Sequence, residues 1–375
     1  MPISAYSKSM KGEYDVVQLL GWLHPGSATK PDPTHIAQTD RDFIARDVVC
    51  PGCGLGDPAV VVSGRSKTDR KRLTSQPHFR FPRHLELCEF ETDNNTSSLA
   101  DHLVKLNSTN SALTRLIGDW VSKGIELGIF DQQTMREMRQ WFLKCRQDHS
   151  YRCDVDEKFI KELLKLPYDY PSRSPTFTPA MAKLPNFNPN EFGNQRFIEE
   201  NQDIYAALRR DRHALYSMRQ NHSPIVARIK RSAGALIFDP SSAEREYRQV
   251  RQLAHFIVDQ DRSSRWPPKF LEDERKASYS LISAFCALLL FSNSGEMDGA
   301  IEAYARIRAG GEPTDRLAGN VIGLNPFFDH GILSAIAMAH EVKKLRPSGL
   351  VVESRIDQIR QEMSSSALPG KWGNK

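Results

Sequence analysis

The chain has 375 residues, of which 39% are hydrophobic and 26% are charged, and its formal net charge is +5. This composition excludes a polytopic membrane protein and a fully disordered chain, and the length indicates two or three domains. The small positive charge permits contact with a nucleic acid but does not require it.

Residues 1–93 are rich in turn-forming and β-branched residues, which predicts a small β-rich module. We expect strands at 15–17, 43–49, 59–62 and 78–81. A module of this size cannot bury enough apolar surface to be stable by packing alone, so we expect bound metal to replace part of its core.

The clearest motif of the chain lies in this module, where Cys50 and Cys53 flank a Pro-Gly turn and a glycine follows. Two thiolates three positions apart on a tight turn can bind one tetrahedral zinc ion. Cys88 offers a third thiol some tens of residues later. Either His78 or His84 completes the set, and the spacing from His84 to Cys88 suits a helical turn. The sequence alone does not choose between the two histidines.

The cellular compartment bears on how these cysteines are interpreted. The first residues contain no long apolar core, so no signal peptide is predicted. The longest apolar run, 277–291, is shorter than the roughly 18–20 residues that cross a bilayer, and it predicts a buried helix. We therefore expect a reducing cytoplasm, where paired cysteines bind metal more often than they form disulfides. A redox-active pair is disfavoured because Asp57-Pro58 would break the helix that such a motif opens.

The segment from about residue 15 to residue 90 resembles the amino-terminal zinc-finger region of the competence CoiA-like family. The resemblance is carried by four features: the predicted strands before Cys50, the motif that begins at Cys50 (the zinc knuckle), the His78-Phe79 pair and Cys88. In that family, a histidine-phenylalanine pair and a later cysteine complete the knuckle. The resemblance implies a bacterial protein associated with DNA handling, often continuing into a restriction-type nuclease domain. The strands of such a domain are not found before residue 167.

Two basic segments are predicted to contact phosphate groups. The first lies between residues 64 and 84 and carries Arg65, Lys67, Arg70, Lys71, Arg72, Arg80 and Arg83. The second lies within 208–251, and its candidate residues are Arg228, Lys230 and Arg231. The alternative interpretation is that both segments are solvated loops and helix faces.

From residue 94 onward, apolar residues recur at helical spacing. Residues 94–166 are predicted to form a helical region, and six prolines within 167–193 predict a linker or strap. Residues 194–363 are predicted to form a helical domain, and 364–375 a flexible tail. We expect the helices of this domain near 195–219, 242–260, 270–291, 296–308, 330–345 and 352–363. Cys145, His149 and Cys153 recur at four-residue intervals and are a weaker candidate for a second metal site.

These observations predict a mainly α protein with a small β-rich zinc-finger module at the amino terminus, followed by two helical regions. The leading hypothesis is a non-catalytic cytoplasmic protein that binds nucleic acid or a nucleoprotein complex through its basic residues. Zinc is the expected cofactor, and neither an organic cofactor nor a membrane is expected. One alternative is a protein-interaction adaptor or accessory subunit of a multi-protein bacterial or phage system. Another is a metal-dependent nuclease using His102, which would need clustered carboxylates.

Overall fold

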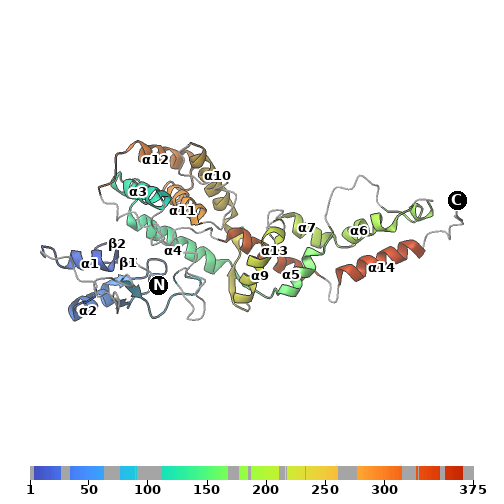
Figure 1. Cartoon of the computed structure of the whole chain (residues 1–375), viewed down its shortest axis with the longest axis horizontal. Helices are drawn as coiled ribbons and strands as arrows, with labels where there is room; N and C mark the ends of the chain where they lie inside the picture. Colours follow the sequence, from blue (N-terminus) through green and yellow to red (C-terminus); the bar gives the residue numbers. More distant parts are fainter. Residues whose placement is uncertain are drawn as a thin grey trace, which may run out of the picture. The chain divides into compact units, whose positions relative to one another are not determined.

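The computed structural model describes residues 4–26, 34–62, 77–88, 90, 112–167, 177–184, 187–210, 216, 218–232, 234–260, 277–314, 327, 329–346 and 351–365 (Figure 1). Most of the described residues are helical, and the strands form three small sheets of two or three strands. The predicted fold class, mainly α with a small β region at the amino terminus, is confirmed.

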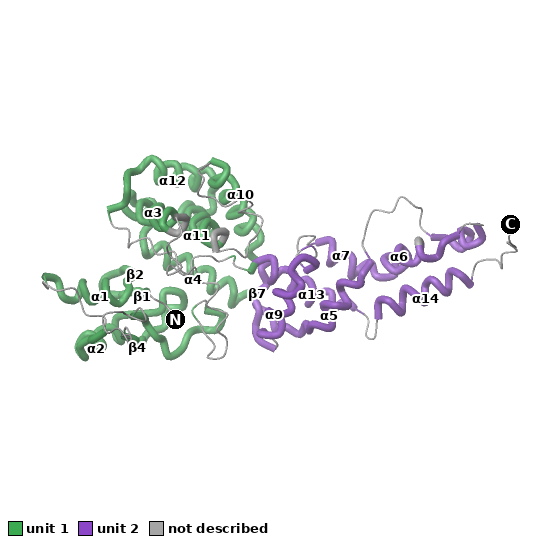
Figure 2. The backbone as a smooth tube through the Cα atoms, in the orientation of Figure 1, with its two compact units in different colours: residues 1–149, 242–329 green, residues 150–241, 330–375 purple. Residues whose placement is uncertain are grey.

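Two compact units make up the chain, and each combines two separate stretches of sequence (Figure 2). Unit 1 holds residues 1–149 and 242–329, and unit 2 holds 150–241 and 330–375. The predicted helical domain 194–363 is therefore divided between the units, because its central helices pack against helices that precede residue 150.

The first part of unit 1 contains two small antiparallel sheets and two helices around one core. Its elements are β1 (Ser4–Ser7), β2 (Gly12–Asp15), α1 (Val16–Leu23), α2 (Gln38–Asp47), β3 (Val48–Val49), β4 (Ala59–Val61) and β5 (His78–Arg80). Strand β1 lies between β2 and β3, while β4 pairs with β5. Val16, Ile44 and Phe79 are fully buried in the shared core.

Two of the four strands predicted in this region are wrong. Asp15 caps a helix instead of continuing a strand: its carboxylate accepts a hydrogen bond from Gln18 N at 2.8 Å, and the Gln18 side chain accepts one from Asp15 N at 2.9 Å. This reciprocal cap starts α1 at Val16. The segment 43–49 is mostly the end of α2, and only its last two residues are strand. The strands predicted at 59–62 and 78–81 are confirmed as β4 and β5.

The helical part of unit 1 is built around one apolar helix. Its elements are α3 (Ala112–Glu126), α4 (Gln132–Asp148), α10 (Glu244–Gln260), α11 (Ala277–Ser292) and α12 (Met297–Ala309). Helix α11 contacts the other four, and its residues from Ser280 to Leu290 are buried. Trp120 of α3 packs between Phe285 and Tyr304, with ring centroids 5.4 and 5.5 Å away. The apolar run predicted as a buried helix is therefore confirmed.

None of the described helices is, by itself, long and apolar enough to cross a membrane. Ser280–Ser292 and Met297–Ala309 reach the required length and composition together, with a bend of 116° between them.

A buried ion pair joins the β-rich part of unit 1 to α4. Arg139 Nη1 donates to Glu13 Oε2 at 2.5 Å, and these residues are only 3% and 8% exposed. Ser4 Oγ donates to the other carboxylate oxygen at 2.6 Å, and Glu13 N donates to the side chain of Gln132. Because both carboxylate oxygens have partners, burial of this charge is compensated.

The described part of unit 2 consists of helices and one short two-stranded sheet. Its elements are β6 (Ser150–Arg152), α5 (Glu157–Leu164), the 3₁₀ turn η3 (Met181–Lys183), α6 (Pro189–Glu200), α7 (Gln202–Arg210), α9 (His222–Arg231), β7 (Leu236–Phe238), α13 (His330–Leu345) and α14 (Val352–Ser365). Helices α6 and α14 lie side by side (Figure 1), with Phe197 and Ile359 fully buried.

Several predicted elements of unit 2 differ from the observed ones. The single helix predicted at 195–219 is interrupted at Asn201, whose side chain donates to the Phe197 carbonyl and ends α6. Helix α6 begins at Pro189, inside the predicted linker, because proline is well suited to the first turn of a helix. Helix α9 and strand β6 were not predicted. Residues 366–375 of the predicted tail lie outside the described residues.

Candidate metal centre

The first half of the centre is a tight turn that follows β3. Cys50 is the first residue after the strand, and its carbonyl accepts a hydrogen bond from Gly54 N at 2.9 Å. Gly54 has a φ of +75°, a conformation that favours glycine. Gly52 also leaves little room for a side chain, since a Cβ there would lie 3.0 Å from the Phe90 ring. The two glycines therefore allow Cys50 and Cys53 to approach each other and Cys88.

The second half follows β5 and is a loop. Phe81 is buried and its ring lies 5.6 Å from the ring of His84. Cys88 N donates to the Leu85 carbonyl at 3.0 Å, and Leu87 has a φ of +65°. The backbone from His84 to Cys88 is therefore a turn, and the helical turn expected from this spacing is absent.

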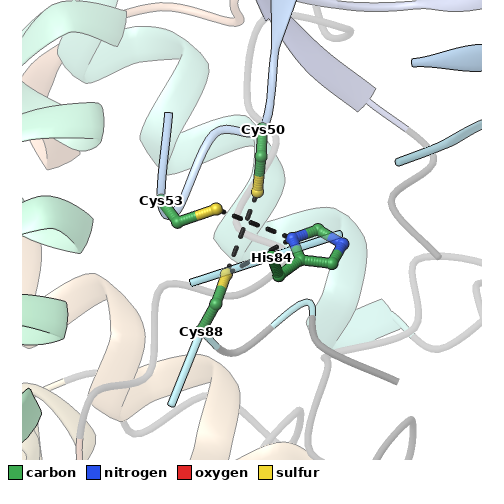
Figure 3. A group of neighbouring side chains, drawn as sticks. All are labelled: Cys50, Cys53, His84 and Cys88. Carbon is green, nitrogen blue, oxygen red and sulfur yellow. Dashed lines mark hydrogen bonds between the residues drawn. The ribbon is translucent and has the colours of Figure 1, made fainter. Parts of the chain in front are cut away.

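Cys50, Cys53, His84 and Cys88 converge on one point (Figure 3). Their ligand atoms all lie within 4.8 Å of one another. His84 Nδ1 is 3.6 Å from the sulfurs of both Cys53 and Cys88, and the sulfurs of Cys50 and Cys88 are 3.9 Å apart. A tetrahedral ion about 2.3 Å from sulfur and about 2.0 Å from nitrogen would separate two sulfurs by about 3.8 Å and sulfur from nitrogen by about 3.5 Å. The four side chains can therefore hold a metal ion.

The electrostatics of the three thiols also favour a cation. Burial raises the pKa of Cys50 to about 12. Hydrogen bonding to Cys50 and Cys53 raises the pKa of Cys88, while hydrogen bonds from Cys50 and Cys88 lower the pKa of Cys53. Without a metal, only one of the three sulfurs readily carries a negative charge. A divalent cation at the centre would stabilise all three as thiolates.

The structure distinguishes the two candidate histidines. His84 belongs to the group of four, whereas His78 lies in β5 opposite Val61 and is not part of it. Within the described residues, this group is the one cluster of three or more potential ligands from His, Cys, Asp or Glu. The weaker candidate trio loses its shared helical face, because α4 ends at Asp148 before Cys153.

Side chains of α4 adjoin the turn that carries Cys50 and Cys53, and no sequence motif indicates them. A Cβ at Gly54 would lie 3.7 Å from Arg136 Nη2 and from Gln140 Nε2. The Arg136 guanidinium also lies over the Tyr6 ring, 4.2 Å from its centroid. Because α4 is about eighty residues away in sequence, spacing could not reveal that its side chains lie beside this turn.

The predicted phosphate-binding residues have different surroundings. Arg80 and Arg83 are exposed, on β5 and on the loop that leads to His84. Arg228 is half-buried in α9, and the exposed Arg231 donates from Nε to the Ala227 carbonyl. Arg65, Lys67, Arg70, Lys71 and Arg72 lie outside the described residues, as does His102.

Lys230, the remaining candidate, already has an acidic partner. Its Nζ lies 2.7 Å from Glu157 Oε2, and Lys161 Nζ lies 2.7 Å from Oε1. Hydrogen bonds from Lys161 and Lys230 lower the pKa of Glu157 to about 2. The positive charge of Lys230 is therefore partly compensated within unit 2.

We expect Lys230→Gln to raise the pKa of Glu157, because one of its two ammonium partners is removed. Carboxyl-carbon NMR titration measures this shift, and Lys344→Gln, at an exposed position of α13, is the control. A lowered pKa in the folded state means that the pairing stabilises the fold above the unfolded pKa of about 4.3 and that this contribution is lost as the pH falls toward 2. An unchanged Glu157 titration in Lys230→Gln would contradict the pairing.

Comparison of the chain with protein-family models, curated proteins and solved structures found no match. The resemblance to the CoiA-like family therefore stays a prediction.

Proposed function

We propose that the chain is a zinc protein that binds nucleic acid through basic residues held in place by the metal centre. The observation that carries this proposal is the convergence of Cys50, Cys53, His84 and Cys88 on one point. The exposed Arg80 and Arg83 lie on the strand and loop that lead to His84. Three thiols and one imidazole are a donor set typical of structural zinc. Four protein side chains would fill all four coordination positions of the zinc ion, so the zinc has a structural role.

Zinc would fix the backbone that carries the two arginines. Arg83 directly precedes His84, and Arg80 ends the strand that leads into the loop. Both side chains are exposed, and within the described residues neither has a hydrogen bond or an ion pair. Exposed, unpaired guanidinium groups bind phosphate oxygens and contribute affinity that falls as salt increases. Such contacts position a nucleic acid but provide little base specificity.

We expect the double variant Arg80→Gln/Arg83→Gln to bind DNA more weakly and with a shallower dependence on salt. Loss of two phosphate contacts lowers the slope of log affinity against log salt by about 2. Fluorescence anisotropy with single-stranded and duplex oligonucleotides between about 50 and 200 mM salt measures both quantities.

The control removes the same charge elsewhere in unit 1. Lys144 and Arg248 are both in ion pairs along their own helices, so Lys144→Gln/Arg248→Gln changes the net charge equally without removing free cations. Equal salt slopes in the two double variants would contradict the proposed contact surface. Absence of any salt-dependent binding by the wild type would favour the adaptor hypothesis instead.

A further inference from the structure

A pocket in the helical part of unit 1 shares no residue with the metal centre. It has a volume of about 390 Å³, within the range of about 300–1,000 Å³ typical of small-ligand sites. Helices α4, α10 and α11 contribute to its lining, and its buried apolar members are Met138, Val250, Ala287, Leu290 and Phe327. A flat hydrophobic ligand that covers this lining is stabilised in the pocket, because apolar surface is removed from water.

Aromatic rings complete the apolar part of the lining. Trp141 is 38% exposed although it is the largest side chain of the pocket. Its ring lies 6.0 Å from that of Phe291, and Phe327 also lines the pocket. A partly exposed indole that lines a cavity can serve as a stacking platform for a planar ring.

Two side chains of opposite charge, both near the start of α10, line the same pocket as Trp141. Arg245 is exposed and Glu246 is half-buried, and both line the pocket. Within the described residues, neither has an ion-pair or hydrogen-bond partner. By contrast, Arg248 Nε lies 2.7 Å from Glu244 of the same helix. The pocket therefore offers one unpaired cation and one unpaired carboxylate to a ligand.

The other polar residue that α10 contributes to the pocket is tied to the loop after α11. Gln249 Nε2 donates to the Gly295 carbonyl at 2.9 Å, and Ser294 and Gly295 also line the pocket. This bond connects α10 to the loop, so part of the polar lining is organised before any ligand binds.

We propose that this pocket binds a guanine nucleotide, either free or as an unpaired guanosine phosphate within a nucleic acid. A planar base would stack on Trp141, and a phosphate would bind Arg245. The Glu246 carboxylate accepts hydrogen bonds only, and guanine presents two adjacent donors, N1–H and the 2-amino group. Adenine presents an acceptor at N1, so it would place a lone pair against the carboxylate.

Titration of the full-length protein with GMP, IMP and AMP tests the base specificity. We expect GMP to quench the fluorescence of Trp141, with weaker binding of IMP, which lacks the 2-amino group, and of AMP. Glu246→Gln should weaken GMP binding by about 10- to 100-fold, since a hydrogen-bonded charged group is lost. Arg245→Gln should weaken GMP binding but not guanosine binding, whereas Arg248→Gln, on the same helix, should have no effect. Trp141→Phe should abolish the quenching, and the buried Trp120 then reports that the fold is retained.

The source of the base is tested with oligothymidylate that carries one central guanosine, compared with plain oligothymidylate. Preference for the guanosine-containing strand assigns the pocket to nucleic acid, and binding of GMP alone assigns it to the free nucleotide. Arg80→Gln/Arg83→Gln should retain GMP binding, so failure of the pocket and failure of the proposed zinc-dependent contact are distinguishable. Equal affinities for GMP and AMP, or full GMP binding by Glu246→Gln, would overturn the inference.

Discussion

Replacing Cys88 with serine is expected to remove zinc from the protein and unfold the first part of unit 1. Cys88 is buried, and its sulfur lies 3.9 Å from that of Cys50 and 3.6 Å from His84 Nδ1. Serine is a poor ligand for zinc, and the three remaining side chains leave the coordination incomplete. Apparent binding free energies of structural zinc are about 10–16 kcal/mol in small zinc-dependent folds at neutral pH, so a large part of the local stability depends on the ion.

Metal content by mass spectrometry and unfolding in urea by circular dichroism measure these effects. Cys145→Ser is the matched control, because Cys145 is a partly exposed thiol in the same unit that adjoins Ser242 instead of the metal centre. We expect one zinc per chain in the wild type and the control, and none in Cys88→Ser. Acidification should release zinc from the wild type, since protons compete for the thiolates. Full zinc content in Cys88→Ser would show that Cys88 is not a ligand.

The second large effect is expected from the buried ion pair between Glu13 and Arg139. Arg139→Met would leave the Glu13 carboxylate buried and without its cation, which typically costs about 3–5 kcal/mol. Methionine retains much of the apolar stem of arginine, so the loss reflects the charge more than packing. Because the pair connects β2 to α4, the free energy of unfolding of unit 1 should fall accordingly.

A double-mutant cycle separates the charge effect from general disruption. We expect the double variant Glu13→Gln/Arg139→Met to be more stable than Arg139→Met alone, since glutamine carries no charge that needs a partner and can still accept from Ser4. Urea unfolding monitored by tryptophan fluorescence gives the three differences. Strictly additive losses in the single variants would contradict a coupled pair.

The elements that could be predicted from sequence are those with a strong apolar period. Helix α13 spans His330–Leu345 as predicted, and α10 spans Glu244–Gln260, where a helix was expected near 242–260. The strand expected at 15–17 is wrong. That prediction relied on the β-branched Val16 and Val17 and overlooked the helix-capping pair next to them. Asp15 and Gln18 form a reciprocal cap that was present in the sequence and indicates a helix.

Metal-ligand spacing identified five candidate residues but could not decide which of the two histidines is the ligand. His78 begins a strand, and its place in the β4–β5 ladder is fixed by pairing with Val61. His84 reaches the thiols because the chain leaves β5 and turns before Cys88, with a positive φ at Leu87. Such a turn depends on the packing of Phe81 and Phe90 into the core, which no short motif encodes.

The division into units was equally hidden from the sequence. The linear order suggests successive domains, whereas α10, α11 and α12 pack with α3 and α4. Composition likewise could not show which cations are free. Lys230 and Arg80 look alike in the sequence, yet only the former has a carboxylate partner among the described residues.

X-ray absorption at the zinc edge of the purified full-length protein tests the central claim most directly. The arrangement of Cys50, Cys53, His84 and Cys88 predicts three sulfur neighbours at about 2.3 Å and one nitrogen at about 2.0 Å. His84→Cys should convert the signal to four sulfurs, while His78→Cys should leave it unchanged. A signal with two nitrogens, or one altered by His78→Cys alone, would contradict the assignment.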